Sequence, residues 1–170
     1  MEVRTAAPPE AVPLSLEALY EAYGDMIYRL ALQRTRNRAD AEDVLQDVFF
    51  RCLRRAPAFE SREHQKAWLI RATINSSKTL LTSAFVRHRT DESALELLPA
   101  GTEPEVSAVY EQVLQLPEKQ RIAIHLFYYE GYGVADIAML MQCPESTVKS
   151  HLRRARLRLK EALKGGDWDV

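Results

Sequence analysis

The sequence predicts an all-α protein of two small helical domains joined by an acidic linker, with a helix-turn-helix at the end of the second domain. Apolar residues recur at steps of three and four over most of the chain, the spacing of a helix face, and no stretch sustains strand-like alternation. Gly and Pro gather between the two periodic halves, at Pro99-Ala-Gly-Thr-Glu-Pro104. We therefore expect a flexible N-terminal arm (1–14), a first domain (15–90), a linker (91–104), a second domain (105–164) and a C-terminal tail (165–170).

Three helices are predicted in the first domain. The first starts near Ser15, where the three- and four-residue apolar spacing begins. The second starts with Asp40 as its N-cap and has to end before Pro57, because proline breaks a helix. The third runs from about Gln65 to Leu80.

Shorter helices are predicted in the second domain. Pro117 is expected at the first helical position of one of them, a place that proline favours. Gln142 and Cys143 form a tight turn before the last and longest helix. The predicted helical ranges are 106–115, 118–130, 134–141 and 144–164.

Charge is nearly balanced over the 170 residues but divided along the chain. The net charge is −1. From Lys149 to Lys164 there are seven Lys or Arg residues and one acid, whereas from Asp91 to Glu118 there are seven acids and no base. This asymmetry indicates separate electrostatic roles for the two stretches.

Composition and motifs disfavour several classes of protein. No apolar run approaches the ~20 residues that cross a bilayer, and the first residues do not resemble a signal peptide, so we expect a cytoplasmic protein. Cys52 and Cys143 belong to no CxxC pair and are predicted to be reduced thiols, with no metal site. The four histidines form no HExxH pair, and no P-loop or GxSxG motif is present. A nucleic-acid hydrolase is therefore disfavoured, and we assign no catalytic residue, cofactor or small-molecule substrate.

The last predicted helix has two contrasting faces. Its apolar face carries Val148, Leu152, Ala155 and Leu159 and is expected to pack on the preceding helix. Its opposite face carries Lys149, Ser150, Arg153, Arg154 and Arg156. Ser146 and Thr147 lie in the first turn, where backbone N–H groups attract phosphate. A charge-rich terminal helix is often only a solvated face, but a short helix, a tight turn and a long basic helix together favour binding in the DNA major groove.

Two segments here resemble the second domain of extracytoplasmic-function sigma factors: Tyr128-Tyr-Glu-Gly-Tyr-Gly-Val-Ala-Asp-Ile-Ala138 and Cys143-Pro-Glu-Ser-Thr-Val-Lys-Ser-His-Leu-Arg-Arg-Ala-Arg156. The resemblance implies that the last helix reads the minus-thirty-five promoter element through the basic and hydroxyl side chains of its outer face. Ser146 stands where the family often has glycine, and Gly133 where it often has serine, which weakens an expected N-cap.

In the first domain, Asp40-Ala-Glu-Asp-Val-Leu-Gln-Asp-Val-Phe-Phe50 resembles the polymerase-binding helix of the same family. Asp43, Gln46, Asp47 and Phe50 share a stripe opposite the buried one. Acidic and amide groups beside an exposed aromatic ring suit a protein interface, although an acidic stripe alone is more often just solvated. The resemblance implies docking on the clamp helices of core RNA polymerase.

The segment Ala67-Trp-Leu-Ile-Arg-Ala-Thr-Ile-Asn75 looks like the family's minus-ten segment. Basic and amide side chains can hold a single strand, and a loop can receive an unstacked base, which we place at Pro57 to His64. Trp68 follows the buried spacing and is interpreted as core. The candidate minus-ten contacts are Phe59, Arg62, Arg71, Asn75 and Lys78.

The resemblance extends from about Leu16 to Leu163 and implies a sigma factor that binds core RNA polymerase and directs promoter binding, melting and transcription initiation. Family members are commonly held inactive by an anti-sigma factor. In this family the connector enters the polymerase channel, so the acidic linker could mimic nucleic acid there or serve only as a spacer. The alternative function is a stand-alone helix-turn-helix regulator of the response-regulator output type.

Overall fold

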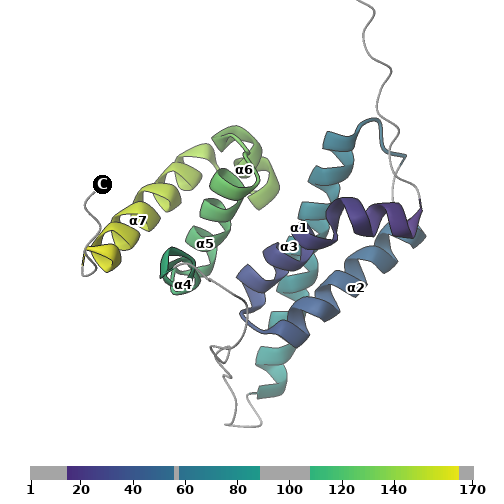
Figure 1. The fold of residues 1–170 in the computed structure, drawn as a ribbon, viewed down its shortest axis with the longest axis horizontal. Coiled ribbons are helices and arrows are strands. Elements are labelled where there is room, and N and C mark those ends of the chain that lie inside the picture. The colour runs from purple at the N-terminus through teal and green to yellow at the C-terminus, as the bar shows by residue number, and fades with distance from the viewer. Residues whose placement is uncertain (1–14, 56–57, 89–107, 165–170) are drawn as a thin grey trace, which may run out of the picture.

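The computed structural model describes residues 15–55, 58–88 and 108–164, and every regular element in these ranges is a helix (Figure 1). The predicted all-α fold is confirmed. The first group contains α1 (Leu16–Thr35), α2 (Arg38–Arg55) and α3 (Arg62–His88). The second group contains α4 (Ala108–Leu114), α5 (Glu118–Ile124), the π-helix η1 (His125–Tyr129), α6 (Val134–Met141) and α7 (Glu145–Leu163). The predicted arm, linker and tail lie outside the described residues, so their boundaries remain predictions.

Local capping explains where the helices of the first group begin. The helix α1 begins next to Ser15, as predicted, and Ser15 is its N-cap, because the Ser15 Oγ accepts a hydrogen bond from the Ala18 N–H at 3.2 Å. The prediction that Asp40 caps α2 was wrong. Asn37 is the cap, since its Oδ1 accepts from the Asp40 N–H at 3.1 Å, and Asp40 lies in the first turn. Asn and Asp cap helices about equally well, and this segment offers both three residues apart.

The third helix is longer than the apolar spacing predicts. Ser61 Oγ accepts from the His64 N–H at 3.0 Å, so the helix begins at Arg62 rather than near Gln65. The loop predicted from Pro57 to His64 is therefore shorter, because its last three residues are already helical.

In the second group, the helix predicted over 118–130 is interrupted. It is α-helical only to Ile124 and continues as η1, in which the Glu130 N–H donates to the carbonyl of His125 at 3.2 Å. Pro117 lies one position before the predicted place, at the N-cap of α5. The predicted helix 134–141 and the turn at Gln142 are present, and Gln142 has a left-handed φ of 53°.

The two groups pack against each other (Figure 1). One apolar core lies within α1, α2 and α3. The other core belongs mainly to the second group but includes Leu30 of α1 and Ile70 of α3, both fully buried. These two side chains join the groups through a shared apolar contact.

Arg121 of α5 makes the main polar connection between the groups. It is 4% exposed. Its Nε–H donates to the carbonyl of Gln33 near the end of α1, while its NH1 group donates to Leu116 at 2.7 Å and Leu114 at 3.0 Å. Burial, with a smaller effect of Arg36, lowers the pKa of Arg121 to about 10. One guanidinium thus satisfies carbonyls at the ends of helices from both groups.

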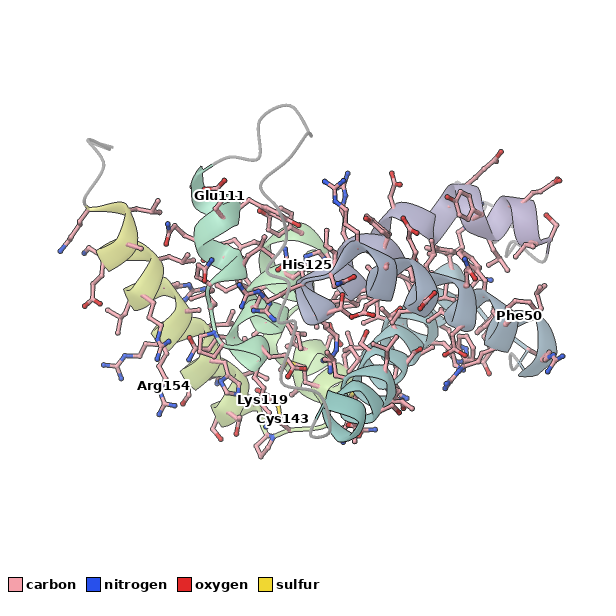
Figure 2. All side chains as sticks on the ribbon, turned by 90° about the horizontal axis from the view of Figure 1, so that it is seen from below. Phe50, Glu111, Lys119, His125, Cys143 and Arg154 are labelled. Atoms are coloured by element: carbon pink, nitrogen blue, oxygen red, sulfur yellow. The ribbon has the colours of Figure 1, made fainter. Side chains whose placement is uncertain are left out.

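A second ionic cluster lies at the same boundary. The Glu130 Oε2 atom forms an ion pair with Nζ of Lys66 in α3 at 2.9 Å, and its Oε1 atom lies 3.5 Å from the Nε2 of His125. The His125 ring stacks on Tyr129, with centroids 5.4 Å apart. In Figure 2, His125 lies near the boundary between the two groups. The hydrogen bond from His125 and the nearby Lys66 lower the pKa of Glu130 to about 2, despite partial burial.

Candidate nucleic-acid and protein interfaces

A tight turn sets the angle between α6 and α7. The Cys143 N–H donates to the carbonyl of Ala138 at 3.0 Å, and the Gln142 N–H bonds to the same turn of α6. Pro144 then caps α7, and its carbonyl accepts from the Thr147 N–H at 2.9 Å. The turn holds α7 firmly against α6.

The predicted apolar face of α7 is buried against α6. Val148, Leu152 and Ala155 are buried in the same core as Ile137 and Leu140. Leu159 is half-buried beside them. This packing fixes which face of α7 points to solvent.

The outer face of α7 is basic and accessible. Ser146 is exposed, and Thr147 is half-buried in the first turn. Figure 2 shows Arg154 on the outer side of α7. Burial, followed by the charges of Lys119 and Arg154, lowers the pKa of His151 at the edge of this face. The exposed side chains of the predicted outer face are Lys149, Ser150, Arg153, Arg154 and Arg156.

One of these arginines has an intramolecular partner that helical spacing in the sequence does not predict. The Arg156 Nε–H donates to the Tyr128 hydroxyl oxygen at 2.8 Å. The guanidinium carbon also lies 5.4 Å from the centroid of the Phe127 ring and 5.6 Å from that of Tyr128. The aromatic run Phe127-Tyr128-Tyr129 is visible in the sequence, but the π-helical turn that sets its orientation is not.

The predicted stripe on α2 is accessible but not uniform. Asp43 and Gln46 are exposed, and Phe50 is 61% exposed. Asp47 is half-buried because it has two partners: the hydroxyl of Ser76, which donates at 2.5 Å, and the Nε of Arg51, at 2.8 Å. Asp47 therefore has a structural role in joining α2 to α3.

An apolar groove lies beside this stripe, between α1 and α2. It has a volume of about 510 Å³. Four of its lining side chains are large, apolar and exposed: Leu16, Tyr20, Phe50 and Leu53. Glu17, Glu21 and Gln46 also line it. The groove therefore combines an apolar floor with acidic and amide groups.

The predicted minus-ten residues fall into two separate sets. Arg71, Asn75 and Lys78 are exposed and share one side of α3, since they are four and seven residues apart. Arg62 is also exposed but lies nine residues before Arg71, which places it on the opposite side of the helix and about 13 Å along the axis. Phe59 is half-buried near that end.

The Phe59 ring packs edge-on against two neighbours. Its centroid is 5.7 Å from that of His64 and 5.8 Å from that of Trp68. Trp68 is half-buried against the first core, as its interpretation as a core residue requires. The structure thus places Phe59 with Arg62 at one end of α3, away from Arg71, Asn75 and Lys78.

No helix within residues 15–55, 58–88 and 108–164 is both long and apolar enough to cross a membrane. Among the same residues, no three His, Cys, Asp or Glu side chains come together as a metal site. Cys52 and Cys143 are free thiols, and burial raises the pKa of Cys52.

Comparison with known families assigns both halves of the chain. The family described as sigma-70 region 2 matches residues 19–84, and the family described as sigma-70, region 4 matches residues 107–159. The stand-alone regulator alternative accounts for the second half only, whereas these two matches account for both halves in order.

Solved structures share the fold. The sigma factor RpoE from Bartonella quintana, determined in complex with the anti-sigma factor NepR, superposes with a TM-score of 0.77 at 23% identity, covering 89% of this chain and 98% of that one. CnrH, in complex with the cytosolic domain of CnrY, gives a TM-score of 0.62 at 19% identity and covers 89% of both chains.

Curated relatives match over most of their length. The ECF RNA polymerase sigma factor SigL of Mycobacterium tuberculosis is 32% identical over 173 residues, covering 94% of this chain and 96% of the relative. SigM of the same species is 30% identical and covers 88% and 77%, respectively. SigW of Bacillus subtilis is 27% identical and covers 86% and 87%. The chain therefore belongs to the ECF family of RNA polymerase sigma factors, which direct promoter-specific transcription initiation.

Proposed function

We propose that this sigma factor binds polymerase and the two promoter elements through three separate surfaces. The α2 stripe of Asp43, Gln46 and Phe50, with the groove beside it, binds core RNA polymerase. The side of α3 that carries Arg71, Asn75 and Lys78 engages the minus-ten strand, and the outer face of α7 binds the minus-thirty-five duplex. Phe59 and Arg62 form a separate candidate contact at the other end of α3.

The observation that carries the DNA-binding proposal is the orientation of α7. Its apolar face is buried on α6, so its basic face points to solvent immediately after a tight turn. A helix about 10–12 Å wide with cations along one side fits the major groove, where Arg and Lys pair with guanine or with phosphate. Ser146 and Thr147 add hydroxyl groups at the helix start, close to backbone N–H donors.

The polymerase-binding proposal depends on the combination of apolar and acidic groups. Exposed Phe50 can anchor in a partner, and Asp43 with Gln46 can pair with basic side chains around it. In Figure 2, Phe50 and Arg154 lie at opposite ends of the molecule. Polymerase and the minus-thirty-five duplex can therefore bind without competing for the same surface.

An anti-sigma factor is the third partner in this proposal. RpoE and CnrH, which share this fold, were each solved in a complex, RpoE with the anti-sigma factor NepR. The groove between α1 and α2 is a suitable surface for such a partner. Sigma factors are DNA-binding regulators rather than enzymes, and we assign no small-molecule substrate. The chain is proposed to act in the cytoplasm, where polymerase and promoter are found.

The first test is co-elution of the full chain with bacterial core RNA polymerase. We expect a stoichiometric complex that Asp43→Ala/Gln46→Ala weakens at least tenfold, about 1.4 kcal/mol. A matched control is Glu111→Ala/Gln115→Ala, which removes one exposed acid and one exposed amide from the second domain. Equal binding by both double variants would refute the α2 stripe as the polymerase-binding surface.

The second test concerns promoter specificity. The reconstituted holoenzyme is used to select duplexes from a random library, and the chain alone is then tested on the selected sequence. A sigma factor is expected to bind this sequence strongly only with polymerase. Arg154→Ala should cost about 1–3 kcal/mol at one base position if Arg154 reads a base. A uniform loss over all sequences would make it a phosphate contact.

A further inference from the structure

Phe127 and Tyr128 form an aromatic shelf beside α7. Their rings meet edge-on, with centroids 5.0 Å apart and an interplanar angle of 72°. Both rings contact the guanidinium of Arg156, and the Tyr128 hydroxyl accepts its Nε–H at 2.8 Å. Tyr128 is nevertheless 57% exposed. Tyr128 and Arg156 are thus in direct contact with each other and remain accessible to solvent.

Each partner retains hydrogen-bonding capacity. A guanidinium has five N–H donors, and the bond to Tyr128 uses only the one on Nε. A phenol oxygen that accepts a hydrogen bond still has its own O–H to donate. Arg156 and Tyr128 can therefore present N–H and O–H donors to one ligand, and a cationic fork with an adjacent hydroxyl is suited to a phosphate.

Position along α7 indicates which phosphate the pair can reach. Arg156 lies seven residues after Lys149, which is two turns, so both residues project from the same side of the helix about 10 Å apart. The major groove is about 12 Å wide. When the first turns of α7 enter the groove, a group two turns further along that side lies near the sugar-phosphate backbone at the groove edge.

We propose that Tyr128 and Arg156 form a clamp for one backbone phosphate of the promoter duplex, with Tyr128 as its positioning residue. The clamp depends on the proposed function, because it requires α7 to be the DNA-binding helix. Arginine ordinarily loses much rotamer freedom when it binds a ligand. Here the two rings and the Tyr128 hydroxyl hold the guanidinium in place before DNA arrives.

The π-helix is what brings the shelf to α7. In η1 the helix is wider by one residue per turn, and the segment ends with the Glu130 N–H bonded to the His125 carbonyl. This change of register turns Phe127 and Tyr128 toward Arg156, whereas Tyr129 stacks on His125. The neighbouring tyrosines therefore have different environments, which makes Tyr129 a natural control.

The test measures binding of the full chain to a fluorescent duplex of random sequence, about 25 base pairs long, between about 0.05 and 0.2 M KCl. A phosphate contact is independent of sequence, so no promoter needs to be known. The single variants are Tyr128→Phe, Tyr128→Ala, Arg156→Ala and Arg156→Lys. They are combined in the double variants Tyr128→Ala/Arg156→Ala and Tyr128→Phe/Arg156→Lys, and the triple variant Lys149→Ala/Arg153→Ala/Arg154→Ala removes the other basic side chains of the α7 face. Tyr129→Phe is the matched control, and thermal unfolding of every variant is measured in parallel.

Arg156→Ala should weaken binding about five- to tenfold and reduce the slope of log K against log salt by ~0.9. Tyr128→Ala should weaken binding about three- to tenfold, Tyr128→Phe by a smaller factor, and Tyr129→Phe should have no effect. The double variant should bind no worse than Arg156→Ala, because the two residues act as one unit. Arg156→Lys should keep the salt slope yet become insensitive to the loss of the Tyr128 hydroxyl.

Two results would overturn the clamp, and they have different meanings. If Lys149→Ala/Arg153→Ala/Arg154→Ala abolishes binding but the Tyr128 and Arg156 variants bind normally, even with lowered melting temperatures, the pair is only a structural contact and the proposed function stands. If the triple variant also binds normally, α7 is not the DNA-binding helix, and both the clamp and the proposed function of this helix fail.

Discussion

The Oε1 atom of Glu118 lies 2.6 Å from NH2 of Arg34, joining α5 of the second group to the end of α1 in the first. The Arg34 side chain is 6% exposed, whereas that of Glu118 is 43% exposed. Burial lowers the pKa of Arg34, and Glu118 opposes that change. The boundary between the two domains therefore contains a buried cation whose counterion is still in contact with water.

Replacing Glu118 with Gln should destabilise the protein. The amide keeps the shape of the side chain but leaves the Arg34 guanidinium without its counterion, at a cost of about 1–2 kcal/mol for a pair that is half accessible. Urea unfolding measures the change. Glu111→Gln, at an exposed site on α4, is the matched control. An unchanged midpoint would mean that the ion pair contributes nothing to stability.

Arg121→Met should separate the unfolding of the two domains. The carbonyls of Gln33, Leu114 and Leu116 lose their donor, which should cost about 2–4 kcal/mol. Because these carbonyls belong to both domains, their connection also weakens. Calorimetry should change from one transition, with equal calorimetric and van't Hoff enthalpies, to two. A single two-state transition at a lower temperature would show that apolar contact alone couples the domains.

Glu130 should make the stability of the folded protein depend on pH in the acid range. Its folded pKa is about 2, below the ordinary value of 4.5, so the folded state binds its proton more weakly than the unfolded state. The resulting stability is fully present above about pH 5 and is lost as the pH falls from about 4.5 towards 2. Glu130→Gln should therefore lower the free energy of unfolding at neutral pH. Its free energy of unfolding, measured in urea, should then decrease less than that of the wild type between pH 5 and 2. Glu145→Gln, at an exposed site, should leave this pH dependence of the free energy of unfolding unchanged.

The two acids of the stripe predicted on α2, Asp43 and Asp47, should behave differently. Asp43→Ala should change the free energy of unfolding by less than about 0.5 kcal/mol, because Asp43 is exposed. Asp47→Ala should cost about 1–2 kcal/mol, since it leaves the buried Ser76 hydroxyl and Arg51 without their acceptor. Equal stability of the two variants in urea would contradict this assignment. Binding tests on polymerase should therefore use Asp43 and Gln46 first.

The parts of the fold that depend on local chemistry could be predicted from the sequence. Ser15 caps α1 through a hydrogen bond three residues away, and Val148, Leu152 and Ala155 follow helical spacing. The error at Asp40 has the same local origin, because Asn37 and Asp40 compete to cap one helix. Apolar spacing alone placed the start of α3 late, since its first turn is polar.

Features that depend on distant contacts could not be predicted. Arg121 lies in the polar run Glu118-Lys-Gln-Arg121, where an arginine is ordinarily exposed, and its acceptors include a carbonyl of α1 from the other domain. The shelf under Arg156 depends on a π-helical turn, which apolar spacing does not reveal. The residues of the candidate DNA-binding face were therefore visible in the sequence, while the partner of one of them was not.

The hydrogen bond from Arg121 to Gln33 can form only late in synthesis, because its two residues lie far apart in the sequence. Gln33 leaves the ribosome roughly 4–18 s before Arg121 does, at about 5–20 residues per second. Until Arg121 emerges, water binds the Gln33 carbonyl of the nascent first domain. Leu30 and Ile70, which later enter the shared core, are then exposed. A nascent chain halted before α5 should therefore be more sensitive to proteases, and more readily bound by chaperones, than the finished protein.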